Sequence, residues 1–249
     1  MEVSFTCQAA PDDRPNDDYA IVSERFVVVL DGATAPAGVD SGCVHDVPWL
    51  VAHLGTHLAR LLDAAEPMPI VEVLRAGIVA TMDDHADTCD LTNRDSPSST
   101  VAILRRRGGM LDYAVLGDSA VMIESNDGEL ILAHDDRTSF LPAYTVEAVS
   151  VARNTETGFW IASNRPDAAD YAVTGSIAES EATRAAVVTD GITRLVERYG
   201  RSWADLLDRL DKAGPAQLVA DVRDEERATP PGTYRGKVHD DATAVFCRF

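Results

Sequence analysis

Residues 27–36 read VVVLDGATAP, an apolar segment that stops at Asp31-Gly32. Four apolar residues rich in valine, followed by Asp-Gly, predict a buried strand that ends on a carboxylate. Three further segments share this design: YAVLGDSAV (113–121) with Asp118, AAVVTDGITRL (185–195) with Asp190, and HDDATAVFCRF (239–249) with Asp240 and Asp241. A fifth acidic site, Asn16-Asp17-Asp18-Tyr19, comes just before the first strand-like segment.

Such strand-end aspartates are suited to holding hard divalent cations. Mg²⁺ and Mn²⁺ prefer oxygen ligands, and carboxylates supply both oxygen and charge. A rigid strand end fixes the direction of each carboxylate, and glycine lets the backbone come close to an ion. Asp-Gly is also ordinary turn chemistry, and Asp127-Gly128 is expected to be only a hairpin connection. The set is more specific than any member, because turn chemistry alone does not explain so many apolar strands ending on carboxylates.

Periodicity along the chain predicts an α+β fold. Strands are expected at 19–22, 26–30, 185–189 and 242–249, and a meander of four antiparallel strands at 100–105, 110–116, 120–124 and 129–133. Helical spacing predicts a helix pair over 48–65 and 70–82, broken at Glu66-Pro67-Met68-Pro69, and later helices at 192–198, from 202 and from 215. Residues 140–181 are expected to form irregular strands and a surface flap. The pattern suggests one domain, residues 1–249, with two sheets covered by helices.

Composition excludes some classes of partner. The chain has 22 basic and 41 acidic residues, a net charge of −19, whereas binding to nucleic acid or acidic membranes needs concentrated Lys and Arg. No apolar run reaches the roughly 20 residues of a membrane helix, and the N-terminus does not resemble a signal peptide, so a cytoplasmic location is expected. The four cysteines contain no C-x-x-C pair and are expected to be free thiols within the packing.

Three tempting signals are assigned ordinary roles. His53 and His57 are four residues apart on a predicted helix, but no Glu follows His53, so they are interpreted as partly exposed helix histidines rather than zinc ligands. Ser119 lies in no nucleophile elbow and is not expected to be a nucleophile. His239 adjoins Asp240 and could hydrogen-bond a substrate or water, but it is expected only to orient the loop.

In order along the chain, the motifs are N-[acidic]-D, apolar–D-G, S-T before a strand, G-D-S, T-D-G and D-[N/D]-x-T before a final strand. This order resembles the metal-dependent protein phosphatases of the 2C type, over about residues 13–249. The resemblance implies a four-layer α/β/β/α sandwich and two Mn²⁺ or Mg²⁺ ions, with a weaker third site. It assigns the ligands as follows: Asp31 bridges two ions, Gly32 offers its carbonyl, Asp190 and Asp240 ligate one ion, Asp17 and Asp18 hold metal-bound waters, and Asp118 helps to form the third site.

The resemblance also implies a mechanism in which hydroxide bridging the two ions attacks the phosphate in line with the leaving oxygen. Asp31, Asp190 and Asp240 would then be the catalytic residues. The family often has an Arg three residues before the motif Asn, where this chain has Asp13, so Arg14, displaced by one, is expected to bind phosphate. Residues Ala33-Thr34-Ala35-Pro36 replace a segment that often ends in Gly-Gly and remove a possible His acid. Ala120 stands where the family has Arg.

Three functions remain open on the sequence. The first is a phosphomonoesterase that acts on phosphoserine or phosphothreonine in proteins. The second keeps the metal chemistry but takes a small phosphoester, because of the displaced Arg14 and the unusual Asp31 loop. The third is a catalytically weak regulatory module that binds a partner. Other phosphatase classes fit worse, since Asp31 has Ala33 two residues on in place of an acid, no R-H-G signature occurs, and no Cys has Arg six positions later.

Overall fold

The computed structural model describes residues 1–12, 14–33, 38–64, 68–143 and 145–249. Within these residues the strands form two antiparallel sheets. The first sheet has the order β2 (Asp18–Val22), β3 (Phe26–Ala33), β5 (Val101–Arg107), β6 (Met110–Leu116) and β9 (Val173–Ala178), and the short β4 (Ser98–Ser99) also pairs with β3. The second has the order β1 (Glu2–Gln8), β11 (Ala242–Arg248), β10 (Ala182–Val188), β7 (Ala120–Ser125) and β8 (Leu130–His134).

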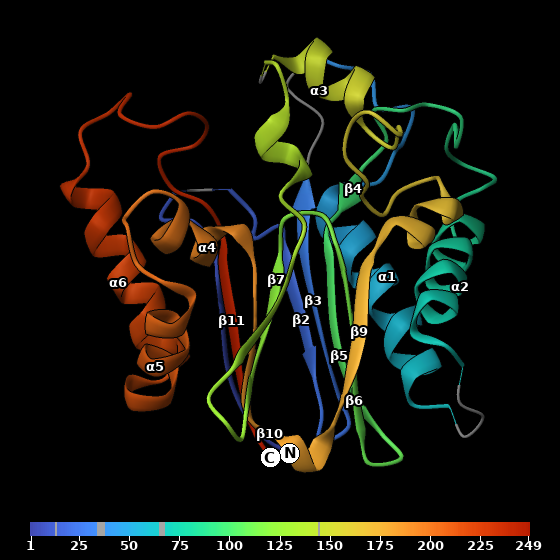
Figure 1. Ribbon diagram of the computed structural model, residues 1–249. Helices are drawn as coiled ribbons and strands as arrows, with labels where there is room; N and C mark the ends of the chain where they lie inside the picture. The colour runs from blue at the N-terminus through green and yellow to red at the C-terminus, as the bar shows by residue number, and fades with distance from the viewer. Residues whose placement is uncertain (13, 34–37, 65–67, 144) are drawn as a thin grey trace.

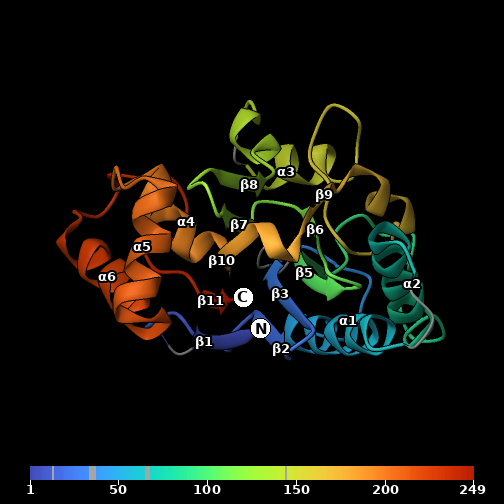
Figure 2. The same ribbon diagram turned by 60° about the horizontal axis from the view of Figure 1, so that its bottom comes forward.

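Helices cover the outer face of each sheet, as Figures 1 and 2 show. The pair α1 (Val47–Leu62) and α2 (Ile70–Asp83) packs on the first sheet. The second sheet is covered by α4 (Asp190–Glu197), α5 (Trp203–Ala213) and α6 (Pro215–Ala228). A third apolar cluster lies between the two sheets. The four-layer α/β/β/α sandwich expected from the sequence is therefore confirmed.

The position of β3 between two layers explains its continuous apolar run. Val28 and Leu30 pack toward α1 and α2, and Val27 and Val29 pack toward the second sheet. All four side chains are fully buried. A strand that is buried on both faces has no polar face, so it does not show the alternation of a half-exposed strand.

Local signals in the sequence define several helix ends. Asp46 accepts a hydrogen bond from the Trp49 N–H and begins α1. Ser202 and Asp205 form the expected capping box of α5. Gly214 ends α5, and Pro215 begins α6.

Two expectations about strands are corrected by the structure. The single meander over 100–133 is wrong: β5–β6 and β7–β8 are hairpins, but β6 and β7 belong to different sheets. The segment Gly117-Asp118-Ser119 carries the chain across, so Asp118 lies at the common end of both sheets. The sequence analysis also did not predict β1, which pairs along its whole length with β11 and whose alternation is weak because its side chains are partly exposed.

The segment over 140–181 contains more helix than expected. It holds part of η1 (Arg137–Phe140), then α3 (Val146–Ala152), η2 (Pro166–Tyr171), strand β9 and η3 (Glu179–Glu181). Figure 1 shows α3 above the upper ends of the strands. Among the described residues no helix is long and apolar enough to cross a membrane. The predicted break at 66–69 begins in residues 65–67, which lie outside the described residues.

Candidate metal centre

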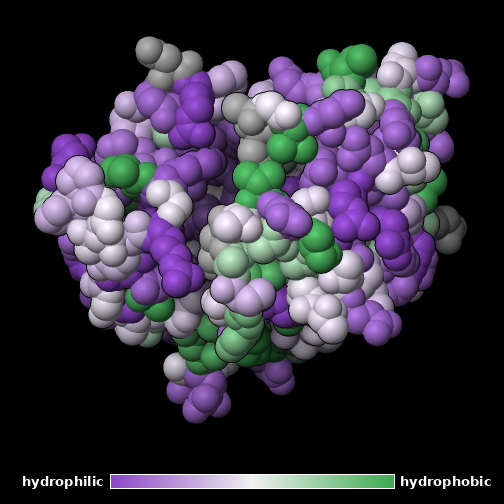
Figure 3. Space-filling model, turned by 90° about the horizontal axis from the view of Figure 1, so that it is seen from above, coloured by the Kyte–Doolittle hydropathy of each residue, from purple (hydrophilic) through white to green (hydrophobic). Residues whose placement is uncertain are grey.

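The strand ends that carry the aspartates lie at the upper edge of the sandwich, below α3 (Figure 1). Asp18 and Asp31 are directly opposite each other in the β2–β3 pair. Asp190 is the first residue of α4, directly after β10, and Asp240 precedes β11. Asp118 lies in the connection between β6 and β7. Figure 3 looks down on this end of the molecule, where hydrophilic residues are prominent.

Asp31 is at the electrostatic centre of this group. Burial raises the pKa of its carboxyl well above the usual value, and the neighbouring carboxylates, Asp190 foremost and then Asp18, raise it further. Its backbone carbonyl accepts hydrogen bonds from the Thr100 N–H at 2.9 Å and from the Ser99 hydroxyl at 3.1 Å. The predicted S-T element therefore supports the backbone of Asp31, while the carboxylate faces other negative charges.

Asp18 is held by two buried threonines. Its Oδ2 atom accepts hydrogen bonds from Thr189 Oγ1 at 2.9 Å and from Thr243 Oγ1 at 2.7 Å. Its Oδ1 atom is buried and has no hydrogen-bond partner. Burial raises the pKa of Asp18 to about 7, although the two threonine hydrogen bonds lower it. A buried carboxylate oxygen without a partner is costly, and a bound cation or its water would supply the missing partner.

Asp190, at the beginning of α4, has a raised pKa for the same two reasons as Asp31. Burial raises its pKa well above the usual value, and Asp240 and Asp118 raise it further. The next residue must be glycine, because a Cβ atom on Gly191 would lie 1.9 Å from the backbone oxygen of Asp241. The T-D-G element thus brings the start of α4 against the segment that carries Asp240 and Asp241.

Asp240 is bound by two basic side chains. Arg194 Nη2 is 3.0 Å from Oδ2, and Lys237 Nζ is 2.9 Å from Oδ1. Burial lowers the pKa of Lys237, but the carboxylates of Asp240, Asp31 and Asp190 outweigh it, so the net change is upward. The cluster therefore already attracts two positive charges, which is the behaviour expected of a cation site.

Asp17, Gly32 and Asp241 tie the N-terminal segment to the site. The Gly32 N–H donates to the Asp17 carbonyl at 3.0 Å, and a Cβ atom on Gly32 would be 2.1 Å from Val47 Cγ1. The Asp241 carboxylate accepts the backbone N–H groups of Ala10 at 2.7 Å and Asp17 at 2.9 Å. The two N–H groups donate to different carboxylate oxygens, so Asp241 satisfies both donors. The single amide oxygen of the Asn often found here in the family could accept only one of these bonds in this geometry.

Asp118 links the site to the segment that carries α3. Its Oδ2 atom accepts a hydrogen bond from Thr138 Oγ1 at 3.2 Å, and burial raises its pKa. A small apolar cluster under α3 contains Leu141, Phe159 and Ile161, and Ala33 packs against it. The flap therefore rests on the end of β3, two residues after Asp31.

Arg14 is exposed and forms an ion pair with Asp12 at 2.8 Å. That hydrogen bond raises the pKa of the guanidinium, and the negative charges of Asp240 and Asp241 add to the effect. Arg14 therefore lies within the electrostatic field of the cluster but is held by a neighbour. Asp13, which stands where the family often has Arg, and the residues Thr34-Ala35-Pro36 lie outside the described residues.

The sequence analysis missed the groups that support the carboxylates. Thr189 and Thr243 stand within the quoted motifs T-D-G and D-[N/D]-x-T, so their spacing was visible but their shared partner Asp18 was not. Lys237 and Arg194 carry no motif signal. Ser119 is fully buried against Thr100, with 2.6 Å between the hydroxyl oxygens. His239 contacts Glu226 at 2.8 Å, as expected of a loop-orienting residue.

The acidic cluster is a wide arrangement. Among the described residues, the groups of three whose ligand atoms all lie within 4.8 Å of one another do not include the strand-end aspartates. They are Cys43, His85 and Cys89, and His53, His57 and Asp84. No three of the described strand-end aspartates therefore bring their carboxylate oxygens this close together. The unpartnered Asp18 oxygen, the raised carboxyl pKa values and the ammonium of Lys237 bound at Asp240 all fit divalent cations at this end of the sheets.

Comparison with known proteins independently supports the fold expected from the order of the motifs. The sequence model described as protein phosphatase 2C matches residues 9–223, and a search of curated proteins finds no match. The fold is similar to that of the Mycobacterium tuberculosis serine/threonine phosphatase PstP/Ppp, with a TM-score of 0.61, 18% identity and coverage of 98% of this chain and 97% of that chain. For the PstP catalytic domain in complex with 2 manganese ions, the values are 0.61, 17%, 98% and 96%. For the phosphatase Stp1 of Staphylococcus aureus they are 0.65, 12%, 100% and 95%.

Proposed function

The chain belongs to the protein phosphatase 2C family of metal-dependent serine/threonine protein phosphatases, and we propose that it is itself an active phosphatase. The observation that supports activity most strongly is the set of carboxylates around Asp31. Asp18, Asp118, Asp190 and Asp240 all raise its pKa, although such a group would be unfavourable without bound cations. A regulatory module without catalysis would have no need to keep this repulsion.

We assign the metal ligands as the motifs suggest. Asp31, Asp190 and Asp240 would hold two Mn²⁺ or Mg²⁺ ions, with the carbonyl of Gly32. Asp17, Asp18 and Asp118 would act at the edge of the centre, the last at a third, weaker position. When bound, such ions activate water and neutralise phosphate charge at neutral pH. The chain's own contribution is to hold the carboxylates apart on rigid strand ends and to keep Asp18 in place through Thr189 and Thr243.

Substrate recognition is proposed from charge and position. Arg14 is exposed, lies within the electrostatic field of Asp240 and Asp241, and would contact the phosphate once its ion pair with Asp12 is broken. Phosphorylated proteins are the proposed substrates, as the family suggests, and small phosphoesters such as sugar phosphates are the competing class. The net charge of −19 supports neither nucleic acid nor acidic membranes as partners.

We also propose that residues 1–249 form one catalytic domain in the cytoplasm. The antiparallel pairing of β1 with β11 joins the two ends of the chain in one sheet, which supports a single unit. The four cysteines are free, which suits a reducing compartment.

The first test is hydrolysis of p-nitrophenyl phosphate by the purified chain with Mn²⁺, with Mg²⁺ and with chelator. Activity should need metal and should fall by at least about 100-fold in Asp31→Asn, since the metal-centred chemistry depends on that carboxylate. A matched control is Asp127→Asn, which alters a hairpin turn far from the site. Phosphopeptides and sugar phosphates are then compared. Bound metal without turnover of any substrate would contradict an active phosphatase, and turnover of sugar phosphates alone would contradict a protein substrate.

A further inference from the structure

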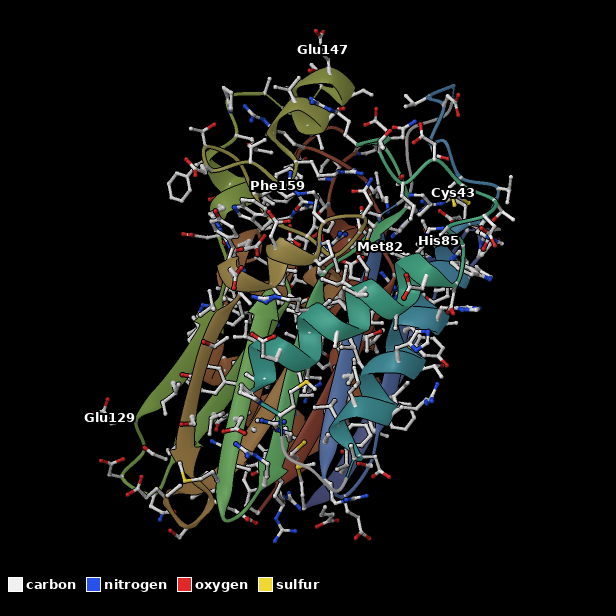
Figure 4. All side chains as sticks on the ribbon, turned by 90° about the vertical axis from the view of Figure 1, so that its right-hand side faces the viewer. Cys43, Met82, His85, Glu129, Glu147 and Phe159 are labelled. Carbon is white, nitrogen blue, oxygen red and sulfur yellow. The ribbon has the colours of Figure 1, made fainter. Side chains whose placement is uncertain are left out.

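We propose a second metal site, formed by Cys43, His85 and Cys89, that takes zinc. The Cys43 Sγ atom is 3.5 Å from His85 Nδ1 and 2.8 Å from Cys89 Sγ. All three ligand atoms lie within 4.8 Å of one another, and both cysteines are free thiols. Figure 4 shows Cys43 and His85 side by side at the end of α2. The site is separate from the strand-end aspartates and shares no residue with them.

The ligand types favour zinc over the ions of the acidic cluster. Thiolate and imidazole are the usual ligands of tetrahedral zinc, whereas Mg²⁺ and Mn²⁺ prefer oxygen. Bond lengths of about 2.3 Å to sulfur and about 2.0–2.1 Å to nitrogen place these two atoms about 3.6 Å apart around a tetrahedral ion. The observed 3.5 Å between Cys43 Sγ and His85 Nδ1 agrees. Two sulfur atoms on one tetrahedral zinc ion lie about 3.8 Å apart, so the sulfur atoms of Cys43 and Cys89, now 2.8 Å apart, would separate by about 1 Å to admit the ion.

The backbone holds the three ligands in place. His85 and Cys89 are four residues apart, and the Cys89 N–H donates to the His85 carbonyl at 3.0 Å, a helical turn that turns both side chains to one side. The Val44 N–H points at Cys89 Sγ, 3.4 Å away, as backbone donors do toward a negative thiolate. The Asp90 N–H donates to the Gly42 carbonyl at 2.7 Å, so the segment around Cys43 is bound to the segment around Cys89.

The candidate fourth ligand is His45, which lies outside the group of three and whose Nε2 atom is 3.4 Å from the Thr88 hydroxyl. His45 follows Cys43 by two residues, and its ring lies 6.0 Å from the ring of His85, measured between centroids. It is stacked on Trp49 at 4.0 Å. Zinc sites with four protein ligands are usually structural, whereas sites with three protein ligands and water in the fourth position are reactive. Replacement of His45 therefore distinguishes a closed site from an open one.

The neighbouring group of His53, His57 and Asp84 has a simpler explanation. His53 Nδ1 and His57 Nε2 are 2.6 and 2.7 Å from the same oxygen of Asp84. Those are hydrogen-bond distances between ring N–H donors and a carboxylate. This group needs no metal, and it offers a matched histidine control next to the proposed site.

The position of the site suggests a structural role for the acidic centre. Cys43 lies on the connection that follows Asp31-Gly32, and Cys89 lies on the connection that leads to Ser98 and Ser99. These serines pair with Ala33 and Gly32. A zinc ion between the two connections would hold together the two segments of the chain that flank the end of β3. Zinc at this site would thus stabilise the backbone around Asp31 without touching substrate.

The experiment uses the full chain carrying Asp31→Asn, which weakens the strand-end site, reduced and stripped with chelator. Co²⁺ is titrated as an optical probe, and Zn²⁺ then competes for it. The expected result is one equivalent of Co²⁺ with a thiolate-to-cobalt charge-transfer band, which oxygen ligands cannot produce, and its loss on adding Zn²⁺. Cys43→Ser and Cys89→Ser should each weaken binding by at least about 100-fold, since loss of even an outer partner weakens metal sites by about 10–100-fold. Cys7→Ser and His53→Ala should leave the band unchanged.

The spectrum of the chain that carries only Asp31→Asn decides the proposal even if the cysteine variants fail to fold. A folded, reduced chain that gives no charge-transfer band would overturn it. So would a band that survives in folded Cys43→Ser and Cys89→Ser. A Cys43–Cys89 disulfide in the air-purified chain, together with no zinc uptake after reduction, would identify a redox pair in place of a metal site.

Discussion

We expect the hydrogen bond from Thr243 to Asp18 to control how readily the acidic centre binds metal. Thr243→Val keeps the shape of the side chain but removes a donor 2.7 Å from a carboxylate oxygen, in a site where both residues are buried. A hydrogen bond to a charged group contributes about 1.5–3 kcal/mol. At 1.36 kcal/mol for each pKa unit, the pKa of Asp18 should rise by about 1–2 units from its value of about 7.

The consequence can be measured as a metal requirement. Near pH 7 about half of Asp18 is ionised, and after the substitution about a tenth to a hundredth would be. Because a cation binds the ionised form, half-saturation with Mn²⁺ should need roughly 5–50 times more metal. The assay is a Mn²⁺ titration by calorimetry, repeated by p-nitrophenyl phosphate hydrolysis.

The pH dependence and a conservative variant make this prediction specific. The deficit should shrink as the pH is raised toward about 9, where the carboxyl ionises in both proteins. Thr243→Ser keeps the hydroxyl and should bind Mn²⁺ almost as the parent does. Equal half-saturation in Thr243→Val and the parent near pH 7, or a deficit that is the same at both pH values, would refute the reasoning.

Three further predictions concern other parts of the site. A carboxyl whose pKa is raised by folding stabilises the fold below its ordinary pKa, and this stability is lost as the pH rises through the folded pKa. For Asp18 that window runs from 3.8 to about 7, so Tm in chelator should fall across it more steeply in the parent than in Asp18→Asn. Equal slopes would contradict the raised pKa. Gly191→Ala should lower the free energy of unfolding in urea by about 1–3 kcal/mol or more, because the new methyl overlaps a backbone oxygen 1.9 Å away; an unchanged value would show that this approach relaxes freely. Arg14→Ala should raise KM for a phosphopeptide several-fold with little change in kcat, because the variant loses a phosphate contact made equally in the ground and transition states. Asp12→Asn frees the guanidinium of Arg14 and should not raise KM.

The support given to the strand-end carboxylates shows where the linear pattern stops being informative. Asp31-Gly32, Asp118, Asp190 and Asp240 could be recognised because each follows or precedes an apolar strand. The repulsion among them, and the two threonines that share Asp18, depend on segments more than 150 residues apart along the chain. The basic residues Lys237 and Arg194 at Asp240 follow from the same convergence.

The group of Cys43, His85 and Cys89 shows the same limit, because the residues are visible in the sequence but their proximity is not. Cys43, His85 and Cys89 are separated by 42 and 4 positions and match no compact zinc motif, so sequence analysis assigned the cysteines to packing. Only the packing of α1 beside α2, together with the contacts between the connections at 40–43 and 89–96, brings the three ligand atoms together.

The sequence by itself determined the layered α+β fold, most helix and strand positions, the family, and the strand-end aspartates, because burial periodicity, caps and Asp-Gly turns are local properties of the chain. The tertiary structure alone decided which sheet each strand joins, and so divided β6 from β7 and paired β1 with β11. It also decided which polar atoms are buried together, and with that the raised pKa of Asp18 and the proximity of the three proposed zinc ligands. These properties depend on distances between segments remote in sequence, and no local pattern encodes such distances.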